Sequence, residues 1–522
     1  MRAIEEVLAL ESLAALSNDL ALEAIGQLID YAGDHADLAL TEKSFSWCEQ
    51  LEARTLSNQQ QAILRYFLAN AWANKQRAKH SDRAAVWAWD QEEAQQQILL
   101  LRRALNSPAF GQLALGWRCQ ILTNLANQLD TVGRFIEARP LWTEALAHEP
   151  AFWMARGNRG YSLVHYARAL YDPGHVAIFA LTAHDELEQA LRDLQEHGEF
   201  GDTTLRSHFA DTAEWIARHT DLDRIRDNHH PGDFDLGEDS ERLYRIWCLR
   251  ETLFLNPLND LGPAAIASHD VLNLPDFVTK VDEPPVLVGL FNQLKQEYAS
   301  ARWLYFEGTR DGPAHFSDRG VLLLNTLDYP MYGLAVEKVK VAFRVTYSLL
   351  DKVAYFLNHY LRLGIPDRKI TFRSIWRDKK GGPVRQPLDA SENWPFRGLY
   401  WLSKDLFEEG FRDSTDPDAR DLDDLRNHLE HKYVKVHAMM VGAGHSDGVG
   451  RGLFFDSLAY SLSLDELERR ALRMLKLVRA ALIYLALGMH QEERRRRAQA
   501  GPGPLMASMA LDTWDDEWKR RH

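Results

Sequence analysis

Residues 334–364, LAVEKVKVAFRVTYSLLDKVAYFLNHYLRLG, decide the fold class of this 522-residue chain. Apolar and aromatic side chains recur in this stretch every three or four residues, which is the spacing of one face of an α-helix. Gly364 and Pro366 follow, and these two residue types commonly end helices. The stretch therefore predicts one long amphipathic helix that buries its apolar face.

The sequence that follows predicts three further helices. They lie in FRGLYWLSKDLFEEGF (396–411), in 419–440 and in 463–490, and no strand pattern separates them. Long antiparallel helices of this kind pack into bundles. We therefore expect an all-α fold with a helical bundle over 331–500, followed by a C-terminal tail over 501–522.

The N-terminal part, 1–200, contains successive amphipathic segments, and the pattern is clearest in CQILTNLANQLDTVGRFIEARPLWTEALAHEP (119–150). Apolar and small residues mark two helices there, Gly133 marks the turn between them, and Pro150 ends the second. This segment resembles a tetratricopeptide repeat. Because one repeat cannot bury its own apolar face, the resemblance implies a tetratricopeptide-like array over 1–200. Such an array is expected to bind a protein or peptide partner.

Residues 201–330 lie between the array and the bundle and are rich in turn formers, as in LNPLNDLGP (255–263). We expect a connector of mixed short elements there, with a strand in VLLLNTL (321–327). The run HHPGDFDLGED (229–239) contains two histidines and four carboxylates but has no fixed metal-ligand spacing. A solvated acidic loop is the favoured interpretation, and a metal site is the alternative.

The candidate chemistry lies in ARDLDDLRNHLEHKYVKVHAMM (419–440). At helical spacing one narrow stripe is apolar, and it consists of Leu422, Leu425, Leu429, Tyr433 and Val436. A different face carries four polar side chains, those of Arg426, Asn427, Glu430 and His431. Asn427 and His431 are four residues apart and therefore adjacent on a helix surface. The pattern predicts a buried stripe and a polar face that is open to solvent.

The polar face has side chains suited to RNA cleavage without a metal ion. An imidazole exchanges protons near neutral pH, and a guanidinium presents a planar fork of donors to phosphate. We expect His431 to move a proton at the ribose 2′-oxygen or at the leaving 5′-oxygen. We expect Arg426, with Asn427 beside it, to stabilise the charge on the scissile phosphate.

Neighbouring side chains are candidates for supporting roles. Those that could orient Arg426 or contact the substrate are Glu430, Lys432 and Lys435. His428 points away from the Arg426 and Asn427 face, so we expect it to be exposed or to contact a neighbouring element. Asp351 and Glu337, on the helix over 334–364, are both candidates for an acidic partner of the motif. The sequence does not choose between these two, and ordinary salt bridges are the simpler interpretation.

The hexapeptide RNHLEH (426–431) resembles the signature of the HEPN superfamily, and YSLLDKVAYFLNHY (347–360) is similar to the first helix of such domains. The resemblance covers 331–490. It implies a ribonuclease that cuts RNA without metal or cofactor and dimerises with two motifs face to face. A tetratricopeptide array in front of a HEPN domain resembles bacterial antiphage, abortive-infection and toxin-type proteins. A HEPN-like module that binds RNA or nucleotide without cutting is the alternative.

Two other segments have the same arginine-to-histidine spacing. In Arg224–His229 the histidine lies beside a Pro-Gly turn, and in Arg310–His315 a glycine and a proline intervene. Because proline interrupts a helix, we expect neither segment to be helical. Arg-x4-His is short enough to occur by chance in a chain of this length. Of the three segments, only 426–431 lies in an amphipathic helix, and this favours it as the functional site. The alternative is that 426–431 is a solvated helix face without function.

Charge and composition restrict the partners and the location. The formal net charge of −14 at pH 7 disfavours non-specific adhesion to nucleic acid, so RNA is expected to bind a small local patch. Three cysteines without a CxxC pair, and no apolar run that would span a bilayer, predict a cytoplasmic protein without membrane contact. The basic run Arg494–Arg497 is a candidate RNA contact or a solvated helix end. Trp514 and Trp518 in the tail predict burial against another surface.

Overall fold

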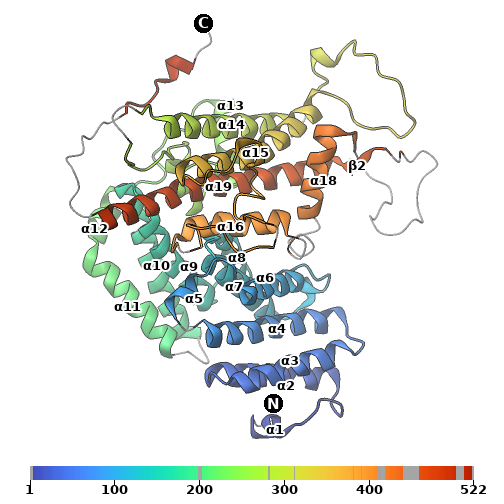
Figure 1. The fold of residues 1–522 in the computed structure, drawn as a ribbon, viewed down its shortest axis with the longest axis vertical. Helices are drawn as coiled ribbons and strands as arrows, with labels where there is room; N and C mark the ends of the chain where they lie inside the picture. Colours follow the sequence, from blue (N-terminus) through green and yellow to red (C-terminus); the bar gives the residue numbers. More distant parts are fainter. Residues whose placement is uncertain are drawn as a thin grey trace.

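The computed structural model describes residues 4–80, 82–197, 203–279, 283–310, 312–379, 381–389, 391–408, 411, 418–438, 456, 458–500 and 511–519. Helices dominate these ranges, and the predicted all-α fold class is confirmed. The long helices of the C-terminal part lie across one side of a stack of N-terminal helices (Figure 1).

The N-terminal part is a series of helices in which neighbours pack together. They are α1 (Ile4–Ala9), α2 (Asn18–Asp34), α3 (Leu38–Glu52), α4 (Asn58–Lys79), α5 (Arg83–Trp87), α6 (Glu92–Leu105), η1 (Phe110–Gln112), α7 (Leu115–Thr131), α8 (Phe135–His148), α9 (Trp153–Ala169) and α10 (Pro173–His197). Local sequence sets several of their starts, because Ser17, Asp37 and Ser57 each cap a helix with a side-chain oxygen. The pairs α4/α6, α7/α8 and α9/α10 are in extensive contact.

The two helices predicted in 119–150 are present as α7 and α8. Gly133 forms the turn with φ of +89°, a left-handed conformation that glycine adopts without strain. In α9, Gly160 allows a close approach to α10, since an added Cβ would lie 3.0 Å from Cβ of Glu186. Helix pairing of this kind fits a repeat array, and the assignment of 1–200 to the tetratricopeptide family stays a prediction.

The region predicted as a connector is more helical than expected. Its elements are α11 (Thr203–His219), α12 (Leu222–Asn228), α13 (Asp239–Arg250), η2 (Pro257–Asp260), η3 (Ala265–Ala267), α14 (Val286–Gly308) and η4 (Phe316–Asp318). The expectation that Arg224–His229 is not helical was wrong, because Pro231 lies beyond α12 and stops the helix only after Asn228. The expected strand at 321–327 was also wrong: no described residue pairs with it.

The C-terminal bundle is built on two long helices, α15 (Leu334–Tyr360) and α19 (Leu464–Ala500). Its other elements are η5 (Asp367–Lys369), α16 (Trp394–Phe407), α18 (Asp418–His431), β1 (Val434–His437), β2 (Tyr460–Ser463) and, in the tail, η6 (Asp516–Lys519). Helix α14 belongs to this bundle, because it packs along α15 and joins it through the Glu307–Lys338 ion pair at 2.9 Å.

The helix predicted over 419–440 was wrong beyond His431. The chain turns there into β1, which pairs in parallel with β2 from Val434↔Tyr460 to His437↔Ser463. Alternating valines in Val434–His437 suit a strand. Val436 is buried and Tyr433 is exposed, so neither continues the apolar stripe of α18.

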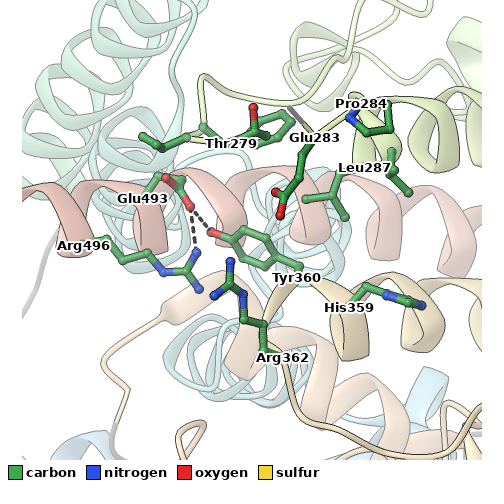
Figure 2. A pocket seen from close by; sticks show the side chains of 12 residues that line it. Thr279, Glu283, Pro284, Leu287, His359, Tyr360, Arg362, Glu493 and Arg496 are labelled. Atoms are coloured by element: carbon green, nitrogen blue, oxygen red, sulfur yellow. Dashed lines mark hydrogen bonds and ion pairs between the residues drawn. The ribbon is translucent and has the colours of Figure 1, made fainter. Parts of the chain in front are cut away.

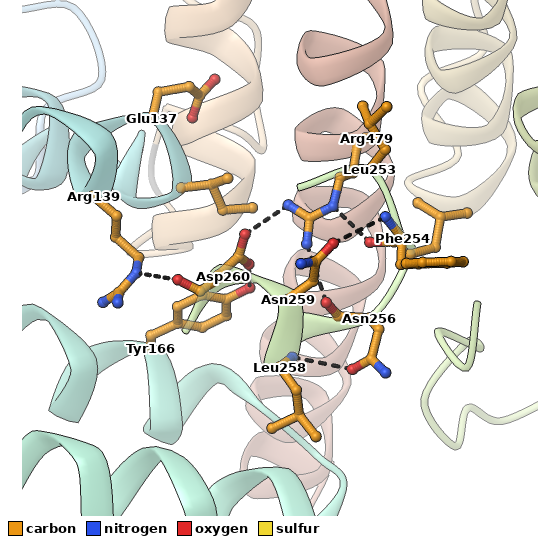
Figure 3. Close-up of polar contacts among 12 residues, drawn as sticks. Glu137, Arg139, Tyr166, Leu253, Phe254, Asn256, Leu258, Asn259, Asp260 and Arg479 are labelled. Carbon is orange, nitrogen blue, oxygen red and sulfur yellow. Dashed lines mark hydrogen bonds and ion pairs between the residues drawn. The ribbon is translucent and has the colours of Figure 1, made fainter. Parts of the chain in front are cut away.

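A buried polar cluster joins the N-terminal array to the bundle (Figure 3). Asp260 of η2 accepts hydrogen bonds from Nη1 of Arg479 in α19 at 2.6 Å and from the hydroxyl of Tyr166 in α9 at 2.8 Å. Nε of Arg139 in α8 donates to the Asp260 carbonyl at 2.8 Å. Because these contacts are buried, the array and the bundle share a common interior.

The far C-terminal features differ from expectation. Trp514 and Trp518 contact each other but are about two-thirds exposed, at 65% and 64%, so their predicted burial is wrong for residues 511–519. In Arg494–Arg497, the outer two arginines donate to backbone carbonyls and the inner two pair with glutamates. Each of the four arginines therefore already has a partner within the protein. None of the described helices has the length and apolarity needed to cross a bilayer.

Candidate functional site

Helix α18 lies between α15, α16 and β1 and presents the motif at one end of the bundle (Figure 1). Leu422 and Leu425 are buried in the core, and Leu429 packs against it partly exposed. The apolar stripe predicted for the helical part is therefore the packed side of α18. The side chains of Arg426 and Asn427 are partly buried, and that of His431 is exposed.

Arg426 is held by two contacts. Its guanidinium carbon lies 5.5 Å from the ring centroid of Tyr347 in α15, and its Nη1 donates to Oδ1 of Asn427 at 3.2 Å. The first contact has the geometry of a cation–π interaction. Arg426 is thus held between Asn427 on its own helix and Tyr347 on the neighbouring helix.

Of the two acidic candidates, Asp351 is the one coupled to the motif. Burial raises the pKa of the Asp351 carboxyl, while a hydrogen bond from the backbone N–H of Phe372 at 2.8 Å and the charge of Arg426 act in the opposite direction. Glu337 instead pairs with Lys340 at 2.8 Å. Asp351 therefore contributes negative charge near Arg426, whereas Glu337 belongs to an ordinary salt bridge.

His431 lies at the last position of α18, at the exposed end of the polar face. Within the described part of the chain its ring forms no hydrogen bond or ion pair. An exposed imidazole without a structural partner is free to exchange a proton with a bound substrate. Among the motif side chains, His431 is thus the one most accessible for chemistry.

Glu430 pairs with Arg344 of α15, a residue that the sequence analysis did not single out. Nε of Arg344 lies 3.1 Å from Oε1 of Glu430, and this hydrogen bond is the largest cause of the lowered pKa of Glu430. Arg426 and His431 lower the same pKa through their charges. Four charged side chains from two helices therefore form one cluster, namely those of Arg344, Arg426, Glu430 and His431. A role of Glu430 in orienting Arg426 stays a prediction.

The part of the chain that contains α18 matches a known protein family. Residues 278–492 match the model of the LA2681-like HEPN family. The match spans α14 to most of α19 and includes every motif residue. It supports a C-terminal HEPN domain. No curated protein matches the chain, and no solved structure does. HEPN domains are usually nucleases or RNA-binding modules, and they often dimerise.

Within the HEPN domain, Lys435 has a structural environment that the sequence did not predict. Its side chain is only 4% exposed and pairs with Asp328 at 2.6 Å and Asp456 at 3.1 Å. A lysine buried between two carboxylates has no free charge for a phosphate, so we drop Lys435 from the candidate substrate contacts. Lys432 is exposed next to His431 and remains a candidate.

His428 faces the small sheet rather than the polar face. Its Nδ1 lies 2.7 Å from the carbonyl oxygen of Asp424, and its ring centroid is 4.9 Å from that of Tyr460 in β2. This position agrees with the expectation that His428 points away from Arg426 and contacts a neighbouring element. It acts as a packing residue between α18 and β2.

A separate pocket of about 330 Å³ lies between α15, α19 and the chain near residue 277 (Figure 2). Arg362 and Arg496 line it together with Glu283 and Glu493. Nη1 of Arg496 pairs with Oε1 of Glu493 at 3.0 Å, and the Tyr360 hydroxyl donates to the same oxygen at 2.8 Å. Because the two positive charges are matched by two negative ones, the pocket does not have the excess positive charge that favours RNA. No motif residue lines it.

The acidic run 229–239 ends at the first residue of α13 and is exposed apart from His229, Leu236 and Gly237, which are partly buried. This agrees with a solvated loop. Across the residues that the structure describes, no three His, Cys, Asp or Glu side chains are placed so that they could share a metal ion. The three cysteines are buried and unpaired.

Proposed function

We propose that the HEPN domain is a metal-independent endoribonuclease whose active site consists of Arg426, Asn427 and His431. The observation that carries the proposal is their placement on one helix of the matched domain, with an exposed His431, free of hydrogen bonds and ion pairs among the described residues, one turn after a contacting Arg426–Asn427 pair. Lys432 adds an exposed positive charge beside this face.

The proposed reaction is an internal transfer at one phosphate of RNA. His431 accepts the proton of a ribose 2′-hydroxyl, the 2′-oxygen bonds to phosphorus, and the bond from phosphorus to the 5′-oxygen breaks. A second acid gives a proton to that 5′-oxygen, so the products are a 2′,3′-cyclic phosphate and a 5′-hydroxyl. Arg426 and Asn427 donate hydrogen bonds to the phosphate oxygens as negative charge develops on them.

The second acid comes from a second copy of the chain in this proposal. One protomer offers one imidazole at the motif, whereas the reaction uses one group that accepts a proton and one that donates it. A two-fold dimer through the HEPN domain supplies both from equivalent residues. It also joins two small basic patches into one groove on a protein whose net charge is −14.

The repeat array is proposed to bind a protein or peptide partner that controls cutting, and the whole protein is proposed to act as a cytoplasmic effector of antiphage, abortive-infection or toxin type. The buried contacts between α8, α9, η2 and α19 support such control. A change in the array is transmitted to α19 through packed side chains rather than through a loose linker.

Cleavage is expected to continue in the presence of a chelator. Imidazole and guanidinium supply the proton transfer and the charge stabilisation themselves, so no Lewis acid is needed. The measurement is incubation of the purified protein with total RNA in excess EDTA, followed by analysis of fragment ends. Complete loss of cutting that one added divalent metal restores would refute the proposed mechanism.

Mixtures of wild-type and His431→Ala protomers test the shared site. Because the proposed site uses one imidazole from each protomer, a heterodimer lacks either the base or the acid, and cleavage is expected to fall with the square of the wild-type fraction. A self-contained site predicts a linear fall instead. Mixing the wild type with His230→Ala, which changes an exposed histidine outside the matched residues, is the control and should leave cleavage unchanged.

A non-catalytic RNA-binding module is the second candidate function. The observation in its favour is that Arg426 is partly buried against Tyr347 and bound to Asn427, as a structural arginine would be. The two functions differ in their products. A binding module retains RNA with unchanged ends, whereas the proposed nuclease releases fragments with 2′,3′-cyclic phosphates.

A further inference from the structure

The segment 316–332, which connects α14 to α15, exposes an unusual amount of apolar surface. Eight of its large apolar side chains are exposed, namely those of Phe316, Val321, Leu322, Leu323, Leu324, Leu327, Tyr329 and Tyr332. Contiguous apolar surface of this kind usually marks a contact with a partner. The segment projects from the molecule at the same end as α18 and β2 (Figure 1).

The central part of this segment has the character of a strand without a neighbour. Exposure alternates along it, with 58% at Val321, 91% at Leu322, 54% at Leu323 and 83% at Leu324, and a period of two is the period of a β-strand. Among the described residues, no group accepts a hydrogen bond from the backbone N–H groups of Leu322 to Leu324. An apolar segment with unpaired backbone groups is a template for pairing with another strand.

The root of the segment is fixed beside the motif helix. The backbone N–H of Met331 donates to the carbonyl of Val436 in β1 at 2.6 Å, and Asp328 pairs with the buried Lys435 at 2.6 Å. Strand β1 begins three residues after His431, where α18 ends. These contacts hold the exposed segment at the end of the bundle that carries the proposed active site.

We propose that residues 322–326 pair with the same residues of a second copy of this chain, as two antiparallel strands centred on Leu324. In this register Leu324 lies opposite Leu324 of the second copy, and the strand ends before Leu327, whose φ of +68° turns the chain. The inference rests on the proposed function, because it names the contact that brings the two motifs of the nuclease into one dimer.

Three observations favour a second copy over other occupants. The segment is self-complementary in this register, since no charged residue lies between Arg319 and Asp328 and like charges are therefore not brought together. A strand pair with a two-fold axis is a closed, isologous contact. Eight exposed apolar side chains, at on the order of 100 Å² each, also approach the roughly 800 Å² per partner of a standard interface.

A cysteine at the two-fold axis tests the register. In Leu324→Cys the two thiols would lie opposite each other, at the spacing of directly paired strand residues and within reach of a disulfide. Diamide, which accepts the two electrons and two protons, is expected to convert most of the protein into a covalent dimer. Leu322→Cys, which lies opposite Thr326, and Leu458→Cys, which is 81% exposed elsewhere, are the matched controls. The native cysteines are buried and should not interfere.

Charge placed on the outward face tests the contact itself. The double variant Leu322→Asp/Leu324→Asp is expected to weaken dimerisation at least 100-fold in sedimentation equilibrium, because four carboxylates would meet in one strand pair. Its far-ultraviolet circular dichroism spectrum should match that of the wild type, since both leucines are exposed and their loss does not disturb the core. Leu38→Asp/Leu243→Asp changes two exposed leucines on α3 and α13 and should leave the dimer intact.

The outcomes separate this inference from the proposed function. A protein that forms the Leu324→Cys dimer but leaves RNA uncut supports the strand pair and refutes the nuclease. A wild type that is monomeric at micromolar concentration and still cuts RNA refutes the strand pair and the shared site, while the nuclease assignment of the motif stands. A dimer that survives the double aspartate substitution, or a monomer that binds lipid vesicles through this segment, also overturns the strand pair.

Discussion

His431→Ala and Arg426→Ala are each expected to reduce RNA cleavage by about 10²–10⁴-fold while leaving the protein folded. His431 is exposed and forms no hydrogen bond within the described chain, so its loss removes a proton-transfer group and no packing. Arg426→Ala additionally removes the partly buried contact with Tyr347, which is worth about 0.5–2 kcal/mol. That is too little to unfold the bundle.

The measurement compares the rate at which fragments with 2′,3′-cyclic phosphate ends appear with the melting temperature of each variant. His230→Ala changes an exposed histidine outside the HEPN match and should retain wild-type cleavage. Leu425→Asp places a charge in the core and should unfold the bundle instead. If His431→Ala cut RNA at the wild-type rate, the assignment of the active site would be wrong. Relief of toxicity on overexpression is the matching expectation in cells.

Periodicity in the sequence was enough to predict α15, most of α19 and the helical geometry of 426–431, because each depends on side chains within a few turns. It failed at β1. Tyr433 and Val436 continue the spacing of the α18 stripe, so the pattern fits a helix and a short strand equally well. The strand forms because β2 pairs with it, from residues that follow more than twenty positions later. A partner that distant leaves no mark in a local pattern.

The same limit applies to the site. The candidate triplet Arg426, Asn427 and His431 is local, so its placement on one helix was predictable, whereas the partners that surround it come from far along the chain. Arg344 reaches Glu430 across 86 positions, and Asp328 reaches Lys435 across 107. Lys435 shows the consequence, because a lysine next to a histidine motif suggests a phosphate contact. Only the fold reveals that two carboxylates hold it.

The sequence also suggested an array separated from a bundle by a connector, and the structure instead joins them through buried charges. Charged residues ordinarily indicate surface, so Arg102, Arg134 and Asp405 carried no signal of burial. In the structure Asp405 of α16 is only 4% exposed and binds Arg102 of α6 at 2.7 Å and Arg134 at the start of α8. This triad ties the array to the HEPN domain.

Asp405→Ala is expected to destabilise the protein by about 3–5 kcal/mol, because it leaves two buried guanidinium groups without their shared carboxylate. Urea unfolding at neutral pH measures the loss. Glu214→Ala removes one partner of an exposed pair with Arg218 and should change the free energy of unfolding by no more than about 0.5 kcal/mol. Equal losses in the two variants would show that the triad is not a structural joint.

The contribution of Asp405 to the free energy of unfolding is expected to depend on pH. Burial alone would raise the pKa of the Asp405 carboxyl, but Arg102 and Arg134 outweigh it and hold this pKa well below its usual range. A carboxyl with a lowered folded-state pKa stabilises the protein above its unfolded pKa of about 3.9, and this stability is lost as the pH falls toward the folded value. The difference in the free energy of unfolding between the wild type and Asp405→Ala should therefore shrink progressively below about pH 4. A difference in the free energy of unfolding that stayed constant from pH 7 to pH 2 would contradict an ionised Asp405 as the source of the stability.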